Sequence, residues 1–241
     1  MFFPSEDQLR ESSIVNPPTG DVIDGPVLVV FEDRIMDIIK KNHELEKVGA
    51  IKECAPATVY RIKGRDVYLY QTPIGAPATA IFMERAIALG GRRFLFFGSC
   101  GGLVPEVRSG QLIVPTEAYR GEGTSSYYLQ YSDYIGMDGS DRLMELMKEH
   151  GMEFMSGRVC STDAMFRETK SYVDKRVEEG CIGIEMECSL ISALSKCRGV
   201  FAASLLFTDD VLTEDEWSTY EDSAVLNSRT MESVISIASK I

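Results

Sequence analysis

The sequence has few histidines, no Cys-x-x-Cys pair and no long apolar run. Its 241 residues include only two histidines, His43 and His150, and no two of its six cysteines are spaced as a Cys-x-x-Cys pair. A zinc cluster is therefore not expected, and neither a metal nor an organic cofactor is implied. No apolar stretch reaches the ~18 residues of a transmembrane helix. The chain is accordingly not expected to span a membrane.

Positive charge is also scarce. Lysines and arginines number 25 against 37 aspartates and glutamates, which gives a formal net charge of −12. A chain without a basic stripe cannot neutralise the phosphates of a nucleic acid or of an anionic membrane surface. Neither kind of partner is therefore expected, and a small molecule suits this chain better.

The first 20 residues differ in composition from the rest of the chain. They are rich in Ser, Glu and Pro, and they have neither the cationic start nor the apolar segment of a signal peptide. We interpret residues 1–20 as an N-terminal arm, either loosely held or packed on a neighbouring subunit. Residues 21–241 are interpreted as one domain. The cysteines are interpreted as reduced, as is usual in a cytoplasmic protein of this length.

The rest of the sequence alternates between strand and helix patterns. Short apolar runs predict buried strands, and apolar residues at helical spacing predict helices that cover them. Strands are predicted over residues 26–31, 58–62, 67–72, 94–97, 111–114, 157–162, 181–185 and 200–207. Helices are predicted over residues 32–42, 77–89, 141–150, 170–179 and 188–197 and in the tail, with a long loop over 121–139. This alternation predicts an α/β fold in which helices flank a central, twisted, mixed and partly parallel sheet.

Three predicted strand ends carry unusual chemistry. They are Gly-Ser-Cys-Gly-Gly at 98–102, Glu-Met-Glu at 185–187 and Thr-Asp-Asp at 208–210. Ligands of such sheets bind beyond the carboxyl ends of strands, so we expect the three segments to converge on one cleft. Each segment also has a purely structural explanation, namely a tight glycine turn, a favourable charge at a helix N-terminus and a helix N-cap.

The side chains in these segments suit a sugar-bearing ligand. A carboxylate such as Glu187 can accept hydrogen bonds from both hydroxyls of a vicinal diol, and Met186 offers an apolar wall for a sugar ring. Two adjacent carboxylates at a buried strand end can raise a pKa and so provide a proton donor. An esterase that uses Ser99 is a rival, but no histidine follows a strand-end acid to serve as its base.

Taken together, the three segments resemble the nucleoside phosphorylase and nucleosidase superfamily. The similar motifs are Gly-Ser-Cys-Gly-Gly at 98–102, Gly-Ile-Glu-Met-Glu at 183–187 and Thr-Asp at 208–209, in the right order and spacing. Segments 114–125 and 161–169 also look like bacterial and archaeal members. The superfamily includes purine nucleoside phosphorylases, uridine phosphorylases and methylthioadenosine nucleosidases. The resemblance implies cleavage of a nucleoside N-glycosidic bond on a nucleoside phosphorylase-like fold, in a homodimer or larger homo-oligomer.

The resemblance also implies roles for individual residues. Glu187 and Met186 would bind the ribose, and Asp209 would protonate the base as the glycosidic bond breaks. The base would lie against a set of small, apolar and acidic residues, namely Cys100, Gly101, Met165, Phe166 and Glu185.

The acceptor of the sugar is left open between phosphate and water. Phosphorolytic relatives usually carry an arginine three residues before the motif serine, where this sequence has Phe96. They also carry Gly-Asp-Pro-x-Arg after the first strand, where this sequence keeps only the arginine. A dianionic phosphate normally needs several charge-assisted donors. The candidates for phosphate or water are Arg34, Ser99 and Arg120.

Hydrolytic relatives place glutamates after the first strand to position water. Glu32 and Asp33 stand in a comparable place, so either is a candidate general base, although both could simply begin a helix. Thr169 and Ser171 stand where uridine phosphorylases read uracil with Gln and Arg, so uridine is not favoured. A nucleoside-binding or storage protein that has lost catalysis is the alternative in another functional class.

Overall fold

The computed structural model describes residues 3–53, 55–212, 217–219 and 225–241. Cys54, one of the cysteines interpreted as reduced, and the first two residues of the predicted arm lie outside these ranges. The strands are β1 Val27–Val30, β2 Leu45–Ile51, β3 Ala57–Ile62, β4 Tyr68–Gln71, β5 Arg93–Gly102, β6 Leu112–Gly121, β7 Tyr134–Gly136, β8 Met155–Thr162, β9 Cys181–Glu185, β10 Phe201–Leu212 and β11 Trp217–Thr219. The helices are α1 Glu6–Arg10, α2 Asp33–Asn42, α3 Ala76–Ala88, α4 Ser140–Glu149, α5 Lys170–Glu178, α6 Cys188–Arg198 and α7 Ser228–Ala238, with 3₁₀ turns η1 Ser125–Tyr127 and η2 Met165–Arg167.

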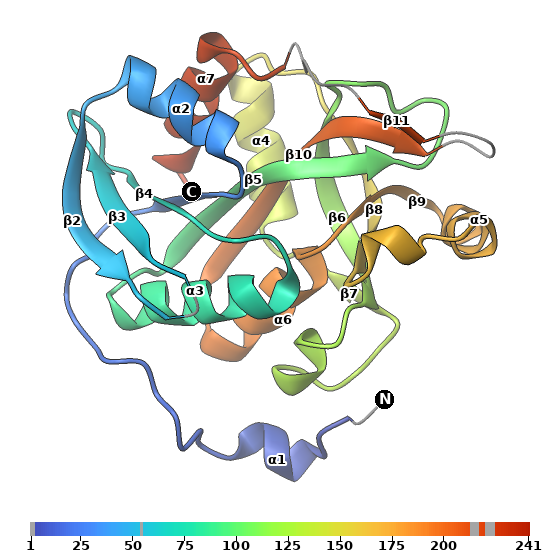
Figure 1. Ribbon diagram of the computed structural model, residues 1–241, viewed down its shortest axis with the longest axis horizontal. Coiled ribbons are helices and arrows are strands. Elements are labelled where there is room, and N and C mark those ends of the chain that lie inside the picture. The colour runs from blue at the N-terminus through green and yellow to red at the C-terminus, as the bar shows by residue number, and fades with distance from the viewer. Residues whose placement is uncertain (1–2, 54, 213–216, 220–224) are drawn as a thin grey trace.

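The described strands form one mixed sheet of 11 strands, part of which closes into a ring. From one edge the order is β2, β3, β4, β1 and β5, and β5 then pairs with both β9 and β10. The ring continues from β10 through β6 and β8 back to β9. The strand β1 runs parallel to β4 and β5, whereas β2 and β3 pair antiparallel to each other. The predicted fold class is confirmed, because helices flank this sheet in a single α/β domain (Figure 1).

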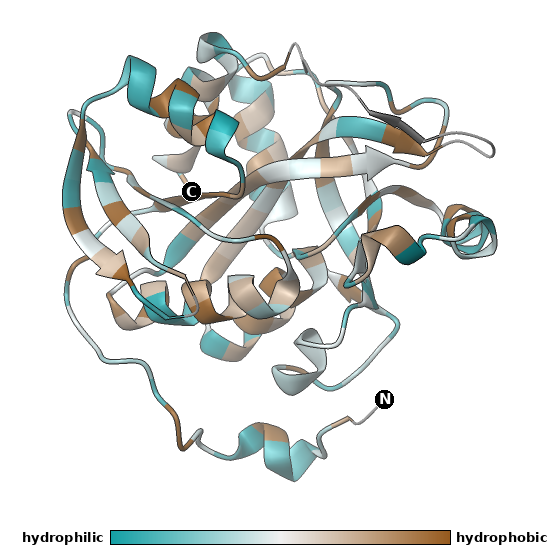
Figure 2. Ribbon diagram, in the orientation of Figure 1, coloured by the Kyte–Doolittle hydropathy of each residue, from teal (hydrophilic) through white to brown (hydrophobic). Residues whose placement is uncertain are grey.

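Helices cover both faces of the open part of the sheet because its central strands are apolar on both faces. In β1, Leu28 and Val30 belong to a core cluster with α2, α4 and α7, whereas Val27 and Val29 belong to a second cluster with α3 and α6. Figure 1 shows these two groups of helices on opposite sides of the strands. Figure 2 shows hydrophobic and hydrophilic residues alternating along α2, as expected for a helix with one buried face.

The predicted hairpin is confirmed. The strands β3 and β4 pair antiparallel around the polar turn at residues 63–66. The edge strand β2 was not predicted, because Glu46 and Lys47 are exposed and the strand has no clean alternation of apolar residues. An edge strand with charged side chains is a common arrangement, since charges discourage pairing with another chain.

The prediction for residues 111–139 is wrong in its boundaries. Instead of ending before Pro115, β6 continues to Gly121, and its register with β8 shifts between Pro115 and Glu117. A bulge accommodates proline, which has no N–H to donate to a neighbouring strand. The predicted long loop contains η1 and the short strand β7, which pairs with β6.

The segment before β1 contains one short helix, α1, none of whose residues is buried. Its first turn is closed by a capping box, in which Ser5 and Gln8 each bond the other's backbone N–H. Figure 1 shows this segment outside the body of sheet and helices. Ile14 and Val15 are among the most exposed large apolar residues of the described chain.

None of the helices among the described residues has the length and apolar character that a membrane crossing requires.

Candidate active site

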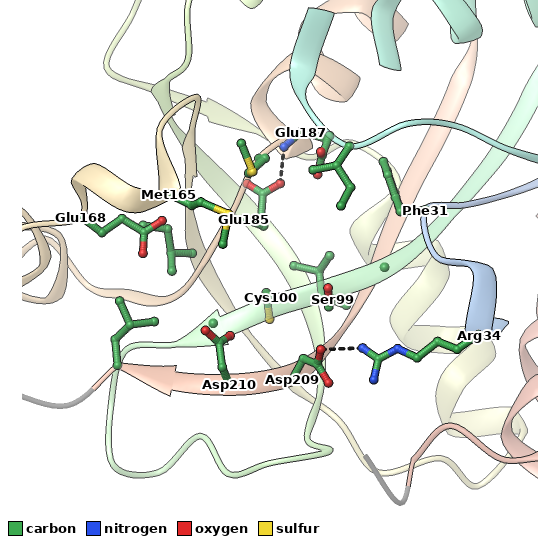
Figure 3. A pocket seen from close by; sticks show the side chains of 17 residues that line it. Phe31, Arg34, Ser99, Cys100, Met165, Glu168, Glu185, Glu187, Asp209 and Asp210 are labelled. Carbon is green, nitrogen blue, oxygen red and sulfur yellow. Dashed lines mark hydrogen bonds and ion pairs between the residues drawn. The ribbon is translucent and has the colours of Figure 1, made fainter. Parts of the chain in front are cut away.

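A cavity of about 480 Å³ lies where β5, β9 and β10 meet. The structure places Ser99, Glu187 and Asp209 on its wall, as the three motifs predict. Figure 3 shows Glu187 on one wall and Asp209 on the facing wall, with Ser99 and Cys100 on the strand between them. The volume suits a small molecule. The lining residues are Phe31, Arg34, Ile74, Gly98, Ser99, Cys100, Gly101, Met165, Glu168, Ile184, Glu185, Met186, Glu187, Leu206, Asp209, Asp210 and Leu212.

The Gly-Ser-Cys-Gly-Gly segment is strand rather than the predicted turn. Residues 98–102 form the last half of β5, which pairs with β10 on one side and, through Gly101 and Gly102, with β9. A Cβ atom on Gly98 would lie 2.6 Å from the Phe31 ring, and one on Gly101 would lie 2.7 Å from a Leu212 methyl carbon. The glycines are therefore needed because cavity-wall side chains lie directly against the backbone.

Asp209 is displaced from the regular strand by a bulge. The sequence predicts that residues 208–210 follow a strand, but β10 runs through them to Leu212. In the pairing with β5, Thr208 faces Cys100 and Asp210 faces Gly101, so Asp209 is the extra residue. Bulges re-aim side chains next to active sites. The bulge thus explains why Asp209 and Asp210, which are neighbours, both line the cavity.

Arg34 lies between two carboxylates at the start of α2. Its Nε donates to Glu32, and its Nη2 donates to Oδ2 of Asp209 at 2.5 Å. The guanidinium carbon lies 5.3 Å from the centre of the Phe207 ring. One oxygen of each carboxylate, Glu32 Oε1 and Asp209 Oδ1, is buried without a hydrogen-bond partner. Each of these two oxygens is therefore a buried acceptor that the described chain leaves without a donor.

Glu185 holds the N-terminus of α6. Its Oε2 accepts from the backbone N–H groups of Glu187 and Cys188, both at 2.6 Å, and its Oε1 accepts from the Ser161 hydroxyl. Burial raises the pKa of Glu185, and these hydrogen bonds act in the opposite direction. Glu185 lines the cavity, but both of its oxygens already have partners. The structure therefore gives it a capping role, which the base-binding prediction did not include.

Glu187 joins two helix N-termini. It is the N-cap residue of α6, and its Oε1 accepts at 2.5 Å from the N–H of Gly75, the N-cap residue of α3. Burial, followed by the nearby charge of Glu185, raises the pKa of Glu187 to about 8. The bond from Gly75 uses Oε1 alone. Met186 lines the cavity beside Glu187, as predicted for a sugar site.

Two acidic residues, Glu168 and Asp210, lie at the end of the cavity away from Arg34, and the sequence analysis assigned no role to Glu168. Glu168 follows η2 and lines the cavity with Asp210. Burial raises the pKa of Glu168 to about 7, and the charge of Asp210 adds to the effect. Figure 3 shows Glu168 beside Met165, on the side of the cavity away from Arg34.

Four predicted site residues, Glu32, Asp33, Arg120 and Phe166, do not line this cavity. Glu32 is joined to it through Arg34, which does line it. Arg120 is buried and donates to the Ser125 hydroxyl and to the carbonyls of Leu129 and Gln130, so it cannot serve as a phosphate ligand in this arrangement. Asp33 accepts from the Gln71 side chain at 3.0 Å. Phe166 is 84% exposed and borders a smaller adjoining cavity of about 230 Å³.

The cavity holds no activated nucleophile. Burial raises the pKa of the Cys100 thiol well above its usual value, which keeps it protonated. Neither His43 nor His150 lines the cavity, so Ser99 has no histidine base there. The esterase reading of Ser99 therefore loses its support. Among the described residues, no group of three or more His, Cys, Asp or Glu side chains is arranged to hold a metal ion.

A family model described as the phosphorylase superfamily matches residues 27–238. The chain belongs to this superfamily. The match covers nearly all of the described sheet and helices, and it confirms both the resemblance and the prediction of an enzyme of this superfamily.

Named relatives of this phosphorylase-superfamily chain include several nucleoside phosphorylases. It is 30% identical over 186 residues to a guanosine phosphorylase from Halorubrum lacusprofundi, covering 73% of each chain. It is 25% identical over 230 residues to a uridine phosphorylase from Thermococcus kodakarensis, covering 88% of this chain and 83% of the relative.

Solved structures of the superfamily have the same fold. Purine nucleoside phosphorylase from Toxoplasma gondii, in complex with immucillin-H, superposes with a TM-score of 0.78 at 20% identity, covering 95% of this chain and 98% of that one. Uridine phosphorylase from Vibrio fischeri gives a TM-score of 0.73 at 22% identity with the same coverage. These similarities confirm the nucleoside phosphorylase-like fold.

Proposed function

We propose that the protein cleaves the N-glycosidic bond of a nucleoside. The observation that carries this proposal is the placement of Glu187 and Asp209 on facing walls of one cavity of nucleoside size. One wall offers a carboxylate for sugar hydroxyls, and the other offers a carboxyl group that in its protonated form can pass a proton to a leaving group. The names of two relatives, guanosine phosphorylase and uridine phosphorylase, support cleavage of the same bond.

The residues divide into a sugar end and a base end. Glu187, whose bond from Gly75 uses Oε1 alone, and Met186 would hold the ribose. Cys100, Gly101 and Met165 would lie against the base, where Cys100 is a neutral thiol and Gly101 leaves room. These contacts would hold the glycosidic bond between the sugar carboxylate and Asp209.

Asp209 would supply the proton that makes the base a better leaving group. Its Oδ2 is held by Arg34, and its Oδ1 is the oxygen without a partner. Proton transfer needs an acid within hydrogen-bond reach of the atom that receives the proton. Arg34 would therefore act as the positioning residue that fixes the orientation of this carboxyl group.

For the acceptor, the charges of the cavity favour water. Arg34 is the one cationic residue among the lining residues of the described chain, and five carboxylates share the wall with it. A phosphate dianion would meet repulsion there and few donors. Glu32 Oε1, buried without a partner, would orient the attacking water. The names of the relatives favour phosphate instead, so the experiment must separate the two acceptors.

The test is base release from a panel of purine and pyrimidine nucleosides by purified protein, with and without inorganic phosphate. Free sugar formed at a rate independent of phosphate would support both parts of the proposal. Strict dependence on phosphate, with sugar 1-phosphate as product, would overturn the water acceptor alone. No release from any nucleoside that nevertheless binds would overturn the enzyme and leave the nucleoside-binding alternative. A homodimer or larger assembly stays a prediction, which the molar mass in solution would check.

A further inference from the structure

Arg34 is paired with two carboxylates of its own protein. Its Nε and Nη2 are bonded to Glu32 and Asp209, and the Phe207 ring lies 5.3 Å from the guanidinium carbon. The side chains of Arg34, Glu32 and Asp209 are 33%, 16% and 29% exposed, respectively. The group of three therefore carries one positive and two negative charges at the wall of the cavity, before any ligand enters.

The contact between Glu32 and Arg34 is built into the chain locally. Glu32 is the N-cap residue of α2, and Arg34 is the second residue of that helix. Although glutamate at this position could interact with the free N–H groups of the helix, the Glu32 side chain makes no capping hydrogen bond. Its one described side-chain partner is Arg34. Helix capping therefore does not account for this carboxylate.

We propose that Glu32 determines the acceptor by holding Arg34 as an internal counter-ion and so excluding oxyanions such as inorganic phosphate. The proposal rests on the proposed function, in which water is the acceptor. An incoming phosphate that contacts Nη1, which neither carboxylate bonds, meets two negative charges beside it, and contact with Nε or Nη2 requires displacement of a carboxylate. It must also approach the negative charge of Glu32, which stays in place because it belongs to the same turn.

Removal of the Glu32 charge should open this site to phosphate. In Glu32→Gln the group of three becomes neutral, while the glutamine oxygen can still accept from Arg34. Because the three side chains are partly exposed, solvent screens part of the effect, and we expect a gain in phosphate affinity of roughly tenfold or more. A phosphate oxygen held by Arg34 and Ser99 would then bond to the anomeric carbon. The glycosidic bond breaks as its electron pair passes to the base, which takes a proton from the Asp209 carboxyl group, after phosphate has displaced this group from Arg34 and it has taken up a proton from solvent.

The experiment measures binding of inorganic phosphate to the full chain by isothermal titration calorimetry, without nucleoside. The variants are Glu32→Gln and Glu32→Ala, and the matched control is Asp37→Asn, which removes one carboxylate from an exposed position on the same helix. We expect roughly tenfold or tighter phosphate binding in both Glu32 variants relative to wild type and to the control. Equal affinity in all four proteins, or tight binding by wild type, would overturn the proposal.

The products of the variants give the second measurement. With a nucleoside that the wild type cleaves, Glu32→Gln should form sugar 1-phosphate in proportion to added phosphate, and Asp37→Asn should form free sugar. Free sugar alone from a Glu32 variant that binds phosphate would also overturn the acceptor role. Because the calorimetry needs no turnover, a gain in phosphate binding without base release from any protein would refute the proposed function while leaving the anion exclusion intact.

Discussion

Arg34 and Asp209 are 175 residues apart in the chain, and their side chains form an ion pair at the wall of the cavity. The pair joins the start of α2 to the bulge of β10. Arg34, the one cationic residue that lines the cavity in the described chain, is thereby held against the carboxylate of Asp209 at the bulge. Arg34 therefore orients the proposed acid. Substitution of Arg34 or Asp209 should affect the chemical step, whereas substitution of Glu187 should affect sugar binding.

Replacement of Asp209 by Asn should separate binding from chemistry. The amide keeps the shape but cannot deliver a proton, so we expect kcat for base release to fall by about 10²–10⁴-fold. Nucleoside affinity should change little, because Glu187, the proposed sugar ligand, is on the other wall. Base release measured by absorbance gives kcat, and calorimetry gives the affinity. The matched control is Asp141→Asn at an exposed position of α4, and unchanged kcat in Asp209→Asn would refute the acid role.

Much of the site could be predicted because its residues lie in local motifs at the ends of apolar strands. Ser99, Glu187 and Asp209 come from three segments that the topology of an α/β sheet brings together. Glu168 could not be found in this way. It follows a 3₁₀ turn with no strand pattern, and its contact with Asp210 depends on how that turn folds over β10.

Arg120 shows the opposite error, since a cation near a predicted loop was taken for an anion ligand. In the structure its guanidinium satisfies two loop carbonyls and a serine hydroxyl, a need that arises only when the loop folds back on β6. The bulge at Asp209 also follows from pairing between β10 and β5, which lie far apart in sequence. Strands with a strong apolar run were predicted well, whereas β2 and β7, which lack one, were not.

Glu187→Gln should stabilise the unliganded protein at alkaline pH. The pKa of Glu187 is about 8 in the folded protein and about 4.3 in an unfolded chain. Between these values the folded state binds more protons than the unfolded state, so stability falls as pH rises from about 4.3 to 8. A glutamine side chain does not ionise, so the variant avoids this loss of stability, and its amide oxygen can still accept the hydrogen bond from the N–H of Gly75.

The melting temperature of Glu187→Gln should therefore exceed that of wild type at pH 8.5 and match it near pH 4.5. Each kcal/mol recovered corresponds to about 2–4 °C for a chain of this size. Differential scanning calorimetry across this range measures the difference. Glu178→Gln, at an exposed position of α5, serves as the control and should follow the wild type. A constant difference at all pH values would contradict the explanation from proton linkage.

Glu168→Gln should remove a pH dependence from nucleoside binding. The wild-type pKa of about 7 comes first from burial, and a nucleoside in the cavity would bury the carboxyl group further. Binding should therefore favour protonated Glu168, and KM in the wild type should rise as pH increases above about 7. KM of Glu168→Gln should lack the part of this rise that is centred near pH 7, because an amide does not titrate there, and should keep any dependence that comes from Glu187, whose pKa is about 8. Identical KM profiles from pH 6 to 8.5 would show that Glu168 does not contact the bound nucleoside.

Gly121 and Gly136 offer a paired test of the close packing beside the site. A Cβ atom on Gly121, the last residue of β6, would collide with the backbone carbonyl oxygen of Ser161 on β8, which cannot rotate away. One on Gly136 of β7 would meet no atom within 4 Å. We expect Gly121→Ala to lose about 1–3 kcal/mol of unfolding free energy through overpacking. Gly136→Ala should be neutral or gain up to about 1 kcal/mol, because alanine lowers the entropy of the unfolded chain. Urea unfolding of both variants measures the two values, and equal stabilities would mean that β6 and β8 can separate at Gly121 at little cost.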